Sequence, residues 1–588
     1  MKEDQSALDN GKTCTDDNDK STLLPNGEKM NRFGFRAPND PRSVKAFNLG
    51  RSRTFPMLAD DVWGDRYWYD APSDDPEWPD VHTYTDSMTY APGETVLFRT
   101  CTHAKQWSLE IVRDGLKPEK IARWEDLEGQ WAPTPRDASK IGCGWPESHR
   151  WTIPPDTRSG FYKVISTCLR SDGTRYVQFH FFVVRPTKAT QTSRLLMVLP
   201  TSTWIAYNNW GGSNYYAGID GETQNRWSPI LSTQRPWSRG VVWLPDNAPR
   251  LVTDAPAEGP AAPRYQTKEW SYANGFGFFY AAAGWAFYDR HFLCWAEREG
   301  IALDMITQHD LHFHSGILDD YKALVIVGHD EYWSYEMRKH VDAFVDRGGN
   351  VARFGGNFAT QVRLEENGDR QVCYKDRALR EDPVRDTDQK HLLTANWDSP
   401  HVAYPGAQTM GVNSSQGIYG GWGGFAPYHS KGFTVYRPDH WVFADTKLTY
   451  GDVFGDKARI FGYEVDGLDY TFRQGLPYPT GSDGAPREVV ILAMAPAVKA
   501  ETMFAEEGWR YYLGNTDMLA SAQAMYGDTS PESVRKVQYG SGMLVYMPRG
   551  KGEVVCGATC DWVMGLARND YFTTRITLNV LKRFTEDR

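Results

Sequence analysis

The 588-residue sequence predicts an α/β protein that begins with an all-β domain. In its first third, short segments of alternating apolar and polar residues are separated by Gly-containing turns, as in an antiparallel β-sandwich. After the polar stretch 187–194, apolar runs become continuous and alternate with amphipathic helical patterns. Such runs are typical of parallel strands buried on both faces, so a doubly wound α/β domain is expected there.

Three segments predict the β-sandwich. Segments 86–102 and 106–115 each contain alternating strands that end at Gly-containing turns, and segment 159–186 contains two strands joined by Ser-Asp-Gly. The residues before them are polar and charged and rich in Asn, Asp, Lys and Gly, which is the composition of a loosely held arm. We therefore expect a flexible N-terminal arm at residues 1–45 and an immunoglobulin-like β-sandwich at residues 46–190.

Residues 191–588 are expected to form the α/β domain, with an additional β-rich part toward the C-terminus. Strand and helix patterns alternate over its first half, and each helical pattern ends at Gly. The expected strands are 195–200, 301–307, 323–328 and 350–356, and the expected helices are 287–300 and 334–349. Further strands are expected at 487–495 and 552–565, before a final helix at 573–584.

Composition excludes several classes of protein. The net charge of −10 argues against a nucleic-acid binder, which needs a basic surface. The N-terminus has no apolar signal segment, and no window of 18 apolar residues suits a membrane helix. The eight cysteines contain no C-x-x-C pair, so reduced cysteines in a cytoplasmic protein are expected. Aromatic residues make up 14%, which suits a ligand pocket, subunit interfaces or simply a β-rich chain.

Polar side chains gather where the predicted parallel strands end. Ligands of open α/β sheets bind at the carboxyl ends of the strands. Four loops lie there: "PTSTWIAYNNWGGSNYY", "TQHDLHFH", "GHDEYWS" and "FGGNFATQVR". Burying polar groups that form no hydrogen bonds costs free energy. This density of polar groups therefore favours a functional site at this edge over a packed core.

The third loop places His329, Asp330 and Glu331 directly after a buried strand. No Ser or Cys nucleophile stands at this corner and no G-x-S-x-G occurs, so an acyl-enzyme mechanism loses support. An imidazole and a carboxylate beside a helix N-terminus are instead suited to binding a metal or a proton. Asp330 is expected to cap the following helix.

Other polar residues have a structural explanation as well as a functional one. The histidines of "HDLHFH" are expected to line a pocket or support the structure more than to bind a metal. Tyr207 would usually form only hydrogen bonds. Glu464 is either an exposed acid in a turn or a second carboxylate contributed by a distant segment.

Six motifs together carry a family resemblance. They are "AYNNWGGSNYY", "WAEREGIALDMITQHDLH", "VGHDEYWSYEMR", "FGGNFATQVR", "CYKD" and "TCDWVMGL". In them the chain resembles the large (beta) subunit family of N,N-dimethylformamidase over residues 80 to 588. The resemblance implies a glutamine-amidotransferase-like α/β layer. It also implies hydrolysis of small N-substituted formamides, with one non-haem Fe(III) ion held by two tyrosinates and a glutamate.

The family's site is carried over residue by residue. The resemblance implies metal binding by Tyr207, Glu331 and a second tyrosine. Relatives have Arg-Pro-Tyr where this chain has Trp237, so we expect Tyr288 as the second tyrosine, ahead of Tyr280 and Tyr265. The implied catalytic residues are His329, Asn357, Lys375 and Glu464.

The expected activity is cleavage of the C–N bond of small N-alkylated amides, giving a carboxylate and an amine, as in xenobiotic degradation. Phenolate and carboxylate are hard donors and suit a hard cation such as Fe(III). Two alternatives stay open: an amidase for a larger N-aryl amide or dialkylurea, and a non-catalytic relative that binds carbohydrate or another ligand. The resemblance implies a homo-oligomer, with or without a separate small subunit.

Overall fold

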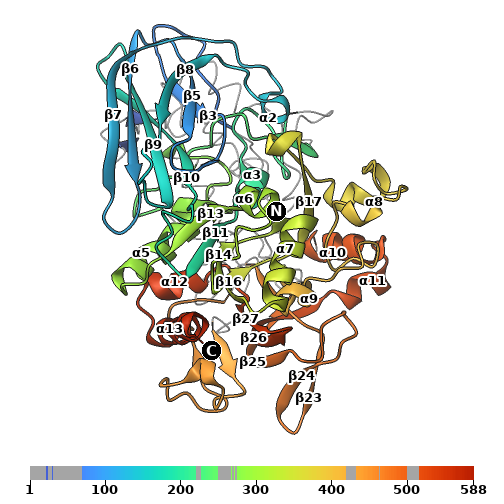
Figure 1. Cartoon of the computed structure of the whole chain (residues 1–588). Helices are drawn as coiled ribbons and strands as arrows, with labels where there is room; N and C mark the ends of the chain where they lie inside the picture. The colour runs from blue at the N-terminus through green and yellow to red at the C-terminus, as the bar shows by residue number, and fades with distance from the viewer. Residues whose placement is uncertain are drawn as a thin grey trace, which may run out of the picture.

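The computed structural model describes residues 69–219, 227–248, 275–418, 432–461, 464–498 and 516–587, three single residues between 267 and 274, and two short strands, β1 (Thr22–Leu23) and β2 (Lys29–Met30). It is a mixed α/β structure with several sheets (Figure 1). Apart from β1 and β2, the predicted N-terminal arm lies outside the described residues.

The N-terminal part contains two sheets that share one hydrophobic core. The first has the order β3 (Val81–Thr85), β5 (Thr95–Thr102) and β8 (Glu147–Thr152). The second has the order β4 (Thr89–Tyr90), β10 (Arg175–Val184), β9 (Gly160–Leu169), β6 (Gln106–Arg113) and β7 (Glu119–Glu128). We call these strands the N-terminal β unit. Buried side chains of both sheets, such as Phe98 and Leu109, belong to one cluster.

A nine-stranded sheet forms the centre of the second part. Its order is β13 (Asp304–Thr307), β11 (Leu195–Leu199), β14 (Ala323–His329), β16 (Asn350–Gly356), β27 (Gly552–Gly557), β26 (Tyr539–Arg549), β25 (Val490–Val498), β20 (Phe433–Val435) and β21 (Val453–Phe454). The first five strands are parallel and the rest are antiparallel. The predicted parallel strands are thus confirmed. Their continuous apolar runs are buried on both faces of the sheet, as the sequence pattern indicates.

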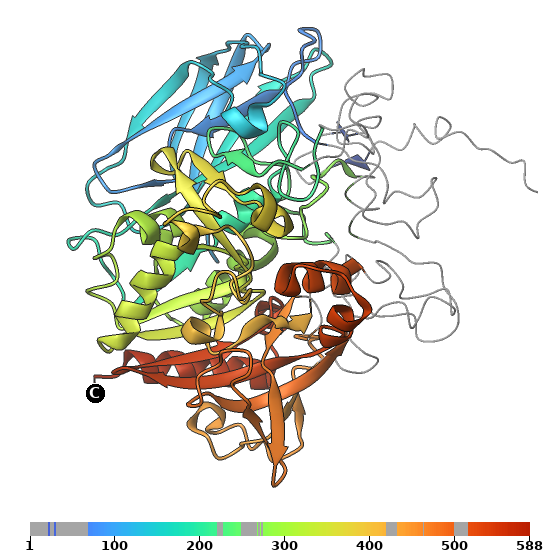
Figure 2. The same ribbon diagram turned by 90° about the vertical axis from the view of Figure 1, so that its right-hand side faces the viewer.

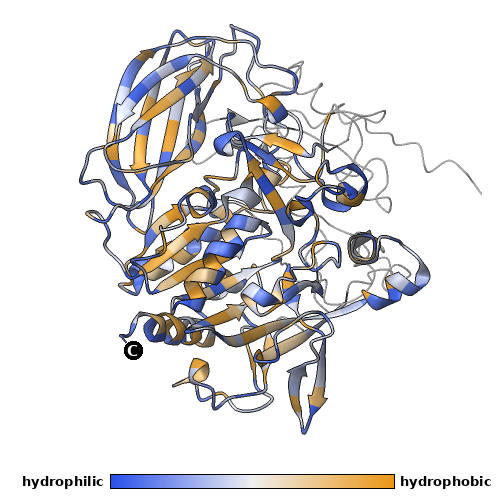
Figure 3. Ribbon diagram, turned by 45° about the vertical axis from the view of Figure 1, so that its right-hand side comes forward, coloured by the Kyte–Doolittle hydropathy of each residue, from blue (hydrophilic) through white to orange (hydrophobic). Residues whose placement is uncertain are grey.

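Helices cover both faces of this sheet. Leu195 and Met197 of β11 pack with α5 (Arg290–Arg298), α12 (Trp562–Ala567) and α13 (Tyr571–Thr585), whereas Leu196 and Val198 pack with α6 (Gln308–Phe313) and α7 (Tyr335–Asp346). The strands between them are mostly hydrophobic (Figure 3). Residues 552–565 differ from the prediction, because the strand ends at Gly557 and α12 follows. The Trp562 ring of α12 packs so closely on Gly557 that a Cβ there would lie 2.7 Å from it.

The predicted β-rich part begins after β16 and includes the hairpin β23 (Tyr470–Arg473) and β24 (Leu476–Pro479), which projects below the sheet (Figure 2). The seven cysteines within the described ranges are all free, and six of them are buried. In the same ranges, the helices are too short or too polar to span a bilayer.

Candidate active site

Two tyrosines of one loop meet above the sheet. Helix α3 (Thr201–Tyr207) follows β11 directly and ends at Tyr207. The chain then turns back, because the Asn214 side-chain amide donates to the Tyr207 carbonyl at 3.0 Å. This return places the Tyr216 ring on the Tyr207 ring, with centroids 4.4 Å apart and planes 17° apart.

The opening turn of the next loop requires glycine. Gly328, near the end of β14, has φ 69°, and a Cβ there would lie 2.6 Å from Cβ of Tyr288. The chain beyond it is held by the Glu331 carbonyl, which accepts from the amides of Ala359 and Thr360 at 3.2 and 2.9 Å. The strand end therefore presents the side chains of His329 and Glu331 to the loop of Tyr207.

Phenol hydroxyls converge on one carboxylate oxygen. Glu331 Oε2 accepts from Tyr207 Oη at 3.0 Å and from Tyr216 Oη at 2.7 Å, and Tyr332 Oη lies 2.8 Å from Tyr216 Oη. Burial, followed by the Glu331 charge, raises the pKa of both Tyr216 and Tyr332 well above the usual value. Without a cation nearby, these two phenols are therefore protonated at neutral pH. Glu331 itself is only 5% exposed.

His329 is oriented as a base. Its Nδ1 lies 2.6 Å from the Ala282 carbonyl oxygen, which can only accept, so Nδ1 carries the proton. Nε2 then offers a lone pair 3.5 Å from Glu331 Oε2 and 3.4 Å from Nδ2 of Asn357. Burial lowers the pKa of His329, so the imidazole is neutral.

Three of the four predicted catalytic residues have positive φ. The values are 62° for Asn357, 50° for Lys375 and 45° for Glu464. Such non-glycine conformations cost about 1–3 kcal/mol each and cluster at functional sites. The Lys375 ammonium lies 3.6 Å from the centroid of the Tyr216 ring. Asn357 Oδ1 is buried and has no hydrogen-bond partner within the described part of the chain.

The backbone of Glu464 lies against Gly356, the last residue of β16. The Glu464 carbonyl accepts from the Cys560 amide at 3.2 Å, and a Cβ at Gly356 would lie 2.0 Å from that carbonyl oxygen. Glycine is thus the only residue type at position 356 that permits this approach, because it has no Cβ. Glu464 is 5% exposed, so its interpretation as an exposed turn acid is wrong.

Sequence reasoning missed Tyr216. Tyr288, the residue expected beside Tyr207 and Glu331, is fully buried in the π-helical turn η2 (Trp285–Asp289) and lies against Gly328, with its ring centroid 6.5 Å from that of His329. Trp237 is buried against Phe181. The available signal was that Tyr216 belongs to the same loop as Tyr207.

The expectation that Asp330 caps α7 is wrong. The N-cap is Ser334, whose hydroxyl accepts from the Met337 amide at 3.2 Å. Asp330 instead accepts from Arg353 of β16 through both oxygens, at 2.6 and 2.9 Å, and Arg353 also donates to Asp466 at 2.8 Å. All three side chains are fully buried.

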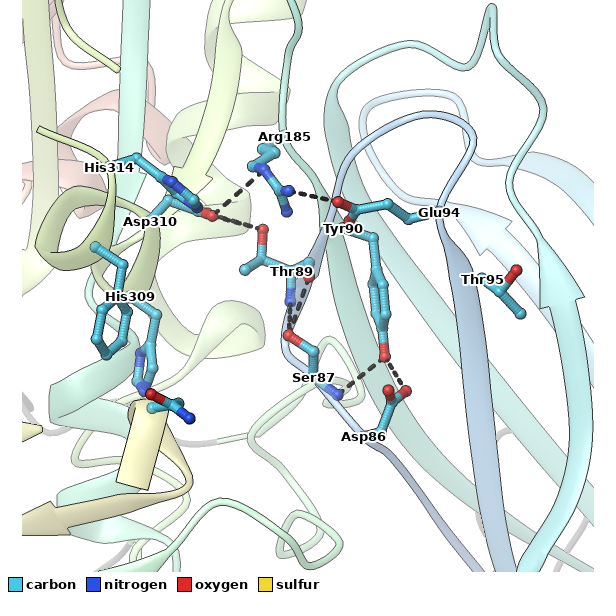
Figure 4. Close-up of a pocket in the computed structure, with 12 residues that line it drawn as sticks. Asp86, Ser87, Thr89, Tyr90, Glu94, Thr95, Arg185, His309, Asp310 and His314 are labelled. Carbon is cyan, nitrogen blue, oxygen red and sulfur yellow. Dashed lines mark hydrogen bonds and ion pairs between the residues drawn. The ribbon is translucent and has the colours of Figure 1, made fainter. Parts of the chain in front are cut away.

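The histidines of "HDLHFH" do not converge. His309 Nε2 lies 3.2 Å from the Gly368 carbonyl, whereas His312 Nδ1 lies 2.7 Å from Ser334 Oγ. Their helix α6 borders a cavity of about 580 Å³ against the N-terminal β unit, where Arg185 lies between Glu94 and Asp310 (Figure 4). Within the described ranges, no three His, Cys, Asp or Glu side chains gather as metal ligands. The Glu331 cluster differs because its other oxygen donors are tyrosines.

The fold and site define an α/β protein with a buried cluster of hard oxygen donors and a neutral imidazole at the carboxyl ends of its parallel strands. The chain belongs to the family described as "N,N-dimethylformamidase beta subunit-like, C-terminal", whose profile matches residues 110–573. The family resemblance is thus confirmed.

Two curated relatives are N,N-dimethylformamidase beta subunits. The protein from Alcaligenes sp is 22% identical over 486 residues and that from Paracoccus aminophilus is 22% identical over 485, in each case 76% of this chain and 55% of the relative. The chain therefore spans about half the length of these relatives. Among solved structures, the sporulation control protein Spo0M from Bacillus subtilis covers 19% of this chain and 50% of its own, with 15% identity and a TM-score of 0.15, which is too low to indicate a shared fold.

Proposed function

We propose that this protein hydrolyses the C–N bond of small N-alkylated amides such as N,N-dimethylformamide, giving a carboxylate and an amine. The observation that carries the proposal is the convergence of the Tyr207 and Tyr216 hydroxyls on Glu331, at 3.0 and 2.7 Å, beside the neutral imidazole of His329. Membership of the family, whose two curated relatives are named for this activity, supports the substrate class.

The donors at this cluster fit a hard cation. Two phenols and a carboxylate are hard oxygen ligands once ionised. Within the described part of the chain, Asn357 Oδ1 is a further buried acceptor without a hydrogen-bond partner. Tyr207, Tyr216 and Glu331 would hold a mononuclear Fe(III), with Tyr216 assigned in preference to Tyr288 because its hydroxyl contacts Glu331. When bound, the ion supplies Lewis acidity toward the carbonyl and a water of lowered pKa.

The chain's own residues supply the proton transfers. His329 Nε2 accepts a proton from the attacking water while a C–O bond forms at the carbonyl carbon, and it returns the proton to the amide nitrogen as the C–N bond breaks. Asn357 Nδ2 donates toward the developing negative charge on oxygen. The Lys375 ammonium above the Tyr216 ring favours negative charge on that phenol. Glu464, a buried carboxylate whose backbone lies against Gly356, is the second candidate for the base that accepts the water proton.

Five further expectations belong to the same proposal. The parallel sheet with helices on both faces supports a glutamine-amidotransferase-like layer after an immunoglobulin-like β-sandwich. Both curated relatives are named as beta subunits, which supports assembly with a separate small subunit. Assembly with copies of this chain is part of the same proposal. We also propose a cytoplasmic protein, because its described cysteines are free.

The test combines metal analysis with product detection. Purified protein is expected to contain iron, to show a visible phenolate-to-iron absorption band and to release dimethylamine and formate from N,N-dimethylformamide. Glu331→Gln should lose both iron and activity. Glu299→Gln, which changes an exposed acid at the end of α5, should retain both. Activity in iron-free protein, or full activity and iron in Glu331→Gln, would refute the proposal.

A further inference from the structure

The N-terminal β unit packs on both elements that lead to the candidate site. Phe161 of β9 stacks on Trp285 at the start of η2, with centroids 4.0 Å apart and planes 3° apart. Phe181 of β10 meets Trp204 of α3 at 5.2 Å. Helix α3 ends in Tyr207, so one aromatic face of the β unit supports both segments.

A single carboxylate of the β unit anchors the π-helical turn. Asp114, which follows β6 and is 1% exposed, accepts from the Trp285 indole nitrogen at 2.8 Å and from Arg290 Nε at 3.1 Å. The Trp285 ring is fully buried, so no water competes for this bond. Lys163 lies further away, at 3.9 Å. Asp114 thus fixes both ends of the turn to the β unit.

The π-helical turn η2 also fixes the orientation of His329. Gly284 precedes it with φ 130°, and a Cβ there would lie 2.8 Å from the Val241 carbonyl, so the backbone is tightly confined. Two residues earlier, the Ala282 carbonyl accepts from His329 Nδ1. At the other end, Tyr288 packs on Gly328, next to His329. A shift of this turn therefore moves the carbonyl that accepts the proton of His329 Nδ1.

We propose that Asp114 is a positioning residue for the site: through Trp285 it holds η2 so that the Ala282 carbonyl keeps His329 Nε2 directed at Glu331. The catalytic meaning of this inference rests on the proposed function. Asp114 touches no reacting group, and it acts across the contact between the N-terminal β unit and the α/β part. A small displacement of a catalytic group costs about a hundredfold in rate, whereas substrate binding is affected less.

The experiment compares three variants with a matched control. Asp114→Ala removes the acceptor, Trp285→Phe removes the donor while keeping a ring on Phe161, and Asp114→Asn keeps an acceptor for the indole. The first two are expected to lower kcat about 10- to 100-fold with KM within about threefold, and Asp114→Asn to restore most of kcat. The control is Thr89→Val, which removes another contact of the β unit, the Thr89–Asp310 hydrogen bonds, and should leave kcat unchanged.

A second readout does not depend on activity. Hydrogen exchange of the amides in residues 282–290 should accelerate in Asp114→Ala and Trp285→Phe, but not in Thr89→Val, while the central strands stay protected in all variants. Unchanged exchange in this segment overturns the inference, as does wild-type kcat in Asp114→Ala or an equal kcat loss in Thr89→Val. If the wild type hydrolyses no amide, the proposed function fails, and the exchange data alone decide whether Asp114 holds the turn.

Discussion

Replacing Arg353 by methionine should destabilise the central sheet strongly. The guanidinium donates to both oxygens of Asp330, at 2.6 and 2.9 Å, and to Asp466 at 2.8 Å, and none of the three side chains is exposed. Removing the cation leaves two carboxylates buried without it. Breaking such a buried pair costs about 3–5 kcal/mol, since desolvation is no longer offset.

Hydrogen exchange measures this loss without assuming a two-state transition in a chain of this size. Amides of β14 and β16, which pair through Gly328 and Gly355, are expected to open about a hundred to a few thousand times more readily in Arg353→Met. Activity should fall as well, because Asp330 precedes Glu331 and Asp466 accepts from the Asn357 amide at 2.9 Å.

Two comparisons identify the cause. Arg150→Met breaks an ion pair of similar length, 2.7 Å, but Arg150 is 68% exposed, so no measurable loss is expected. Adding Asp330→Asn and Asp466→Asn to Arg353→Met removes all three charges and should restore most of the protection. Equal exchange rates of the β14 and β16 amides in Arg353→Met and Arg150→Met would contradict this reasoning. So would a triple variant whose amides exchange as fast as those of Arg353→Met, because the buried charges would then not stabilise these strand ends.

Three further predictions concern the site and the β unit. Tyr216→Phe should weaken the phenolate-to-iron absorption band and Tyr288→Phe should leave it unchanged; the opposite result would make Tyr288 the second ligand. Gly328→Ala should cost about 1–3 kcal/mol in thermal unfolding and lower activity, because φ is 69° and the new Cβ would strike Tyr288; wild-type stability would contradict this. His180 of β10 accepts from the Thr85 amide at 3.2 Å, and burial lowers its pKa to about 3, so only the unfolded chain gains its proton as pH falls below 6.5. Stability should therefore drop by about 2–3 kcal/mol between pH 7 and pH 4.5, and His180→Gln should flatten that dependence in urea titrations.

The parallel strands could be predicted because their buried residues are consecutive in the sequence. Each residue of 323–329 is buried, so no polar alternation interrupts the apolar run. The same reasoning placed His329 and Glu331 at the functional edge, since the strand ends there whatever the loop does. Asp330 could not be interpreted in this way. Its partner Arg353 lies on the neighbouring strand, and only the register between β14 and β16 brings the two together.

Tyr216 and Glu464 show a different limit. The stacking of Tyr216 on Tyr207 depends on a loop that turns back through an Asn214 hydrogen bond. Sequence periodicity does not predict such a loop conformation. Glu464 lies more than a hundred residues from Asn357 in sequence. Its burial depends on a glycine, Gly356, that permits backbone contact at the strand end. Tertiary contacts determine the positions of both Tyr216 and Glu464, and the local sequence does not predict those contacts.

The positive-φ residues explain why the site needs support from outside its own loops. Asn357, Lys375 and Glu464 each adopt a conformation that costs free energy, so the surrounding structure must hold them. Asp466 supplies part of that support at Asn357, since its carboxylate accepts from the Asn357 amide while it is bound to Arg353. The support comes from buried, water-free bonds between elements distant in sequence. The geometry around Glu331 is therefore set by the fold before any ligand arrives, as electrostatic catalysis requires.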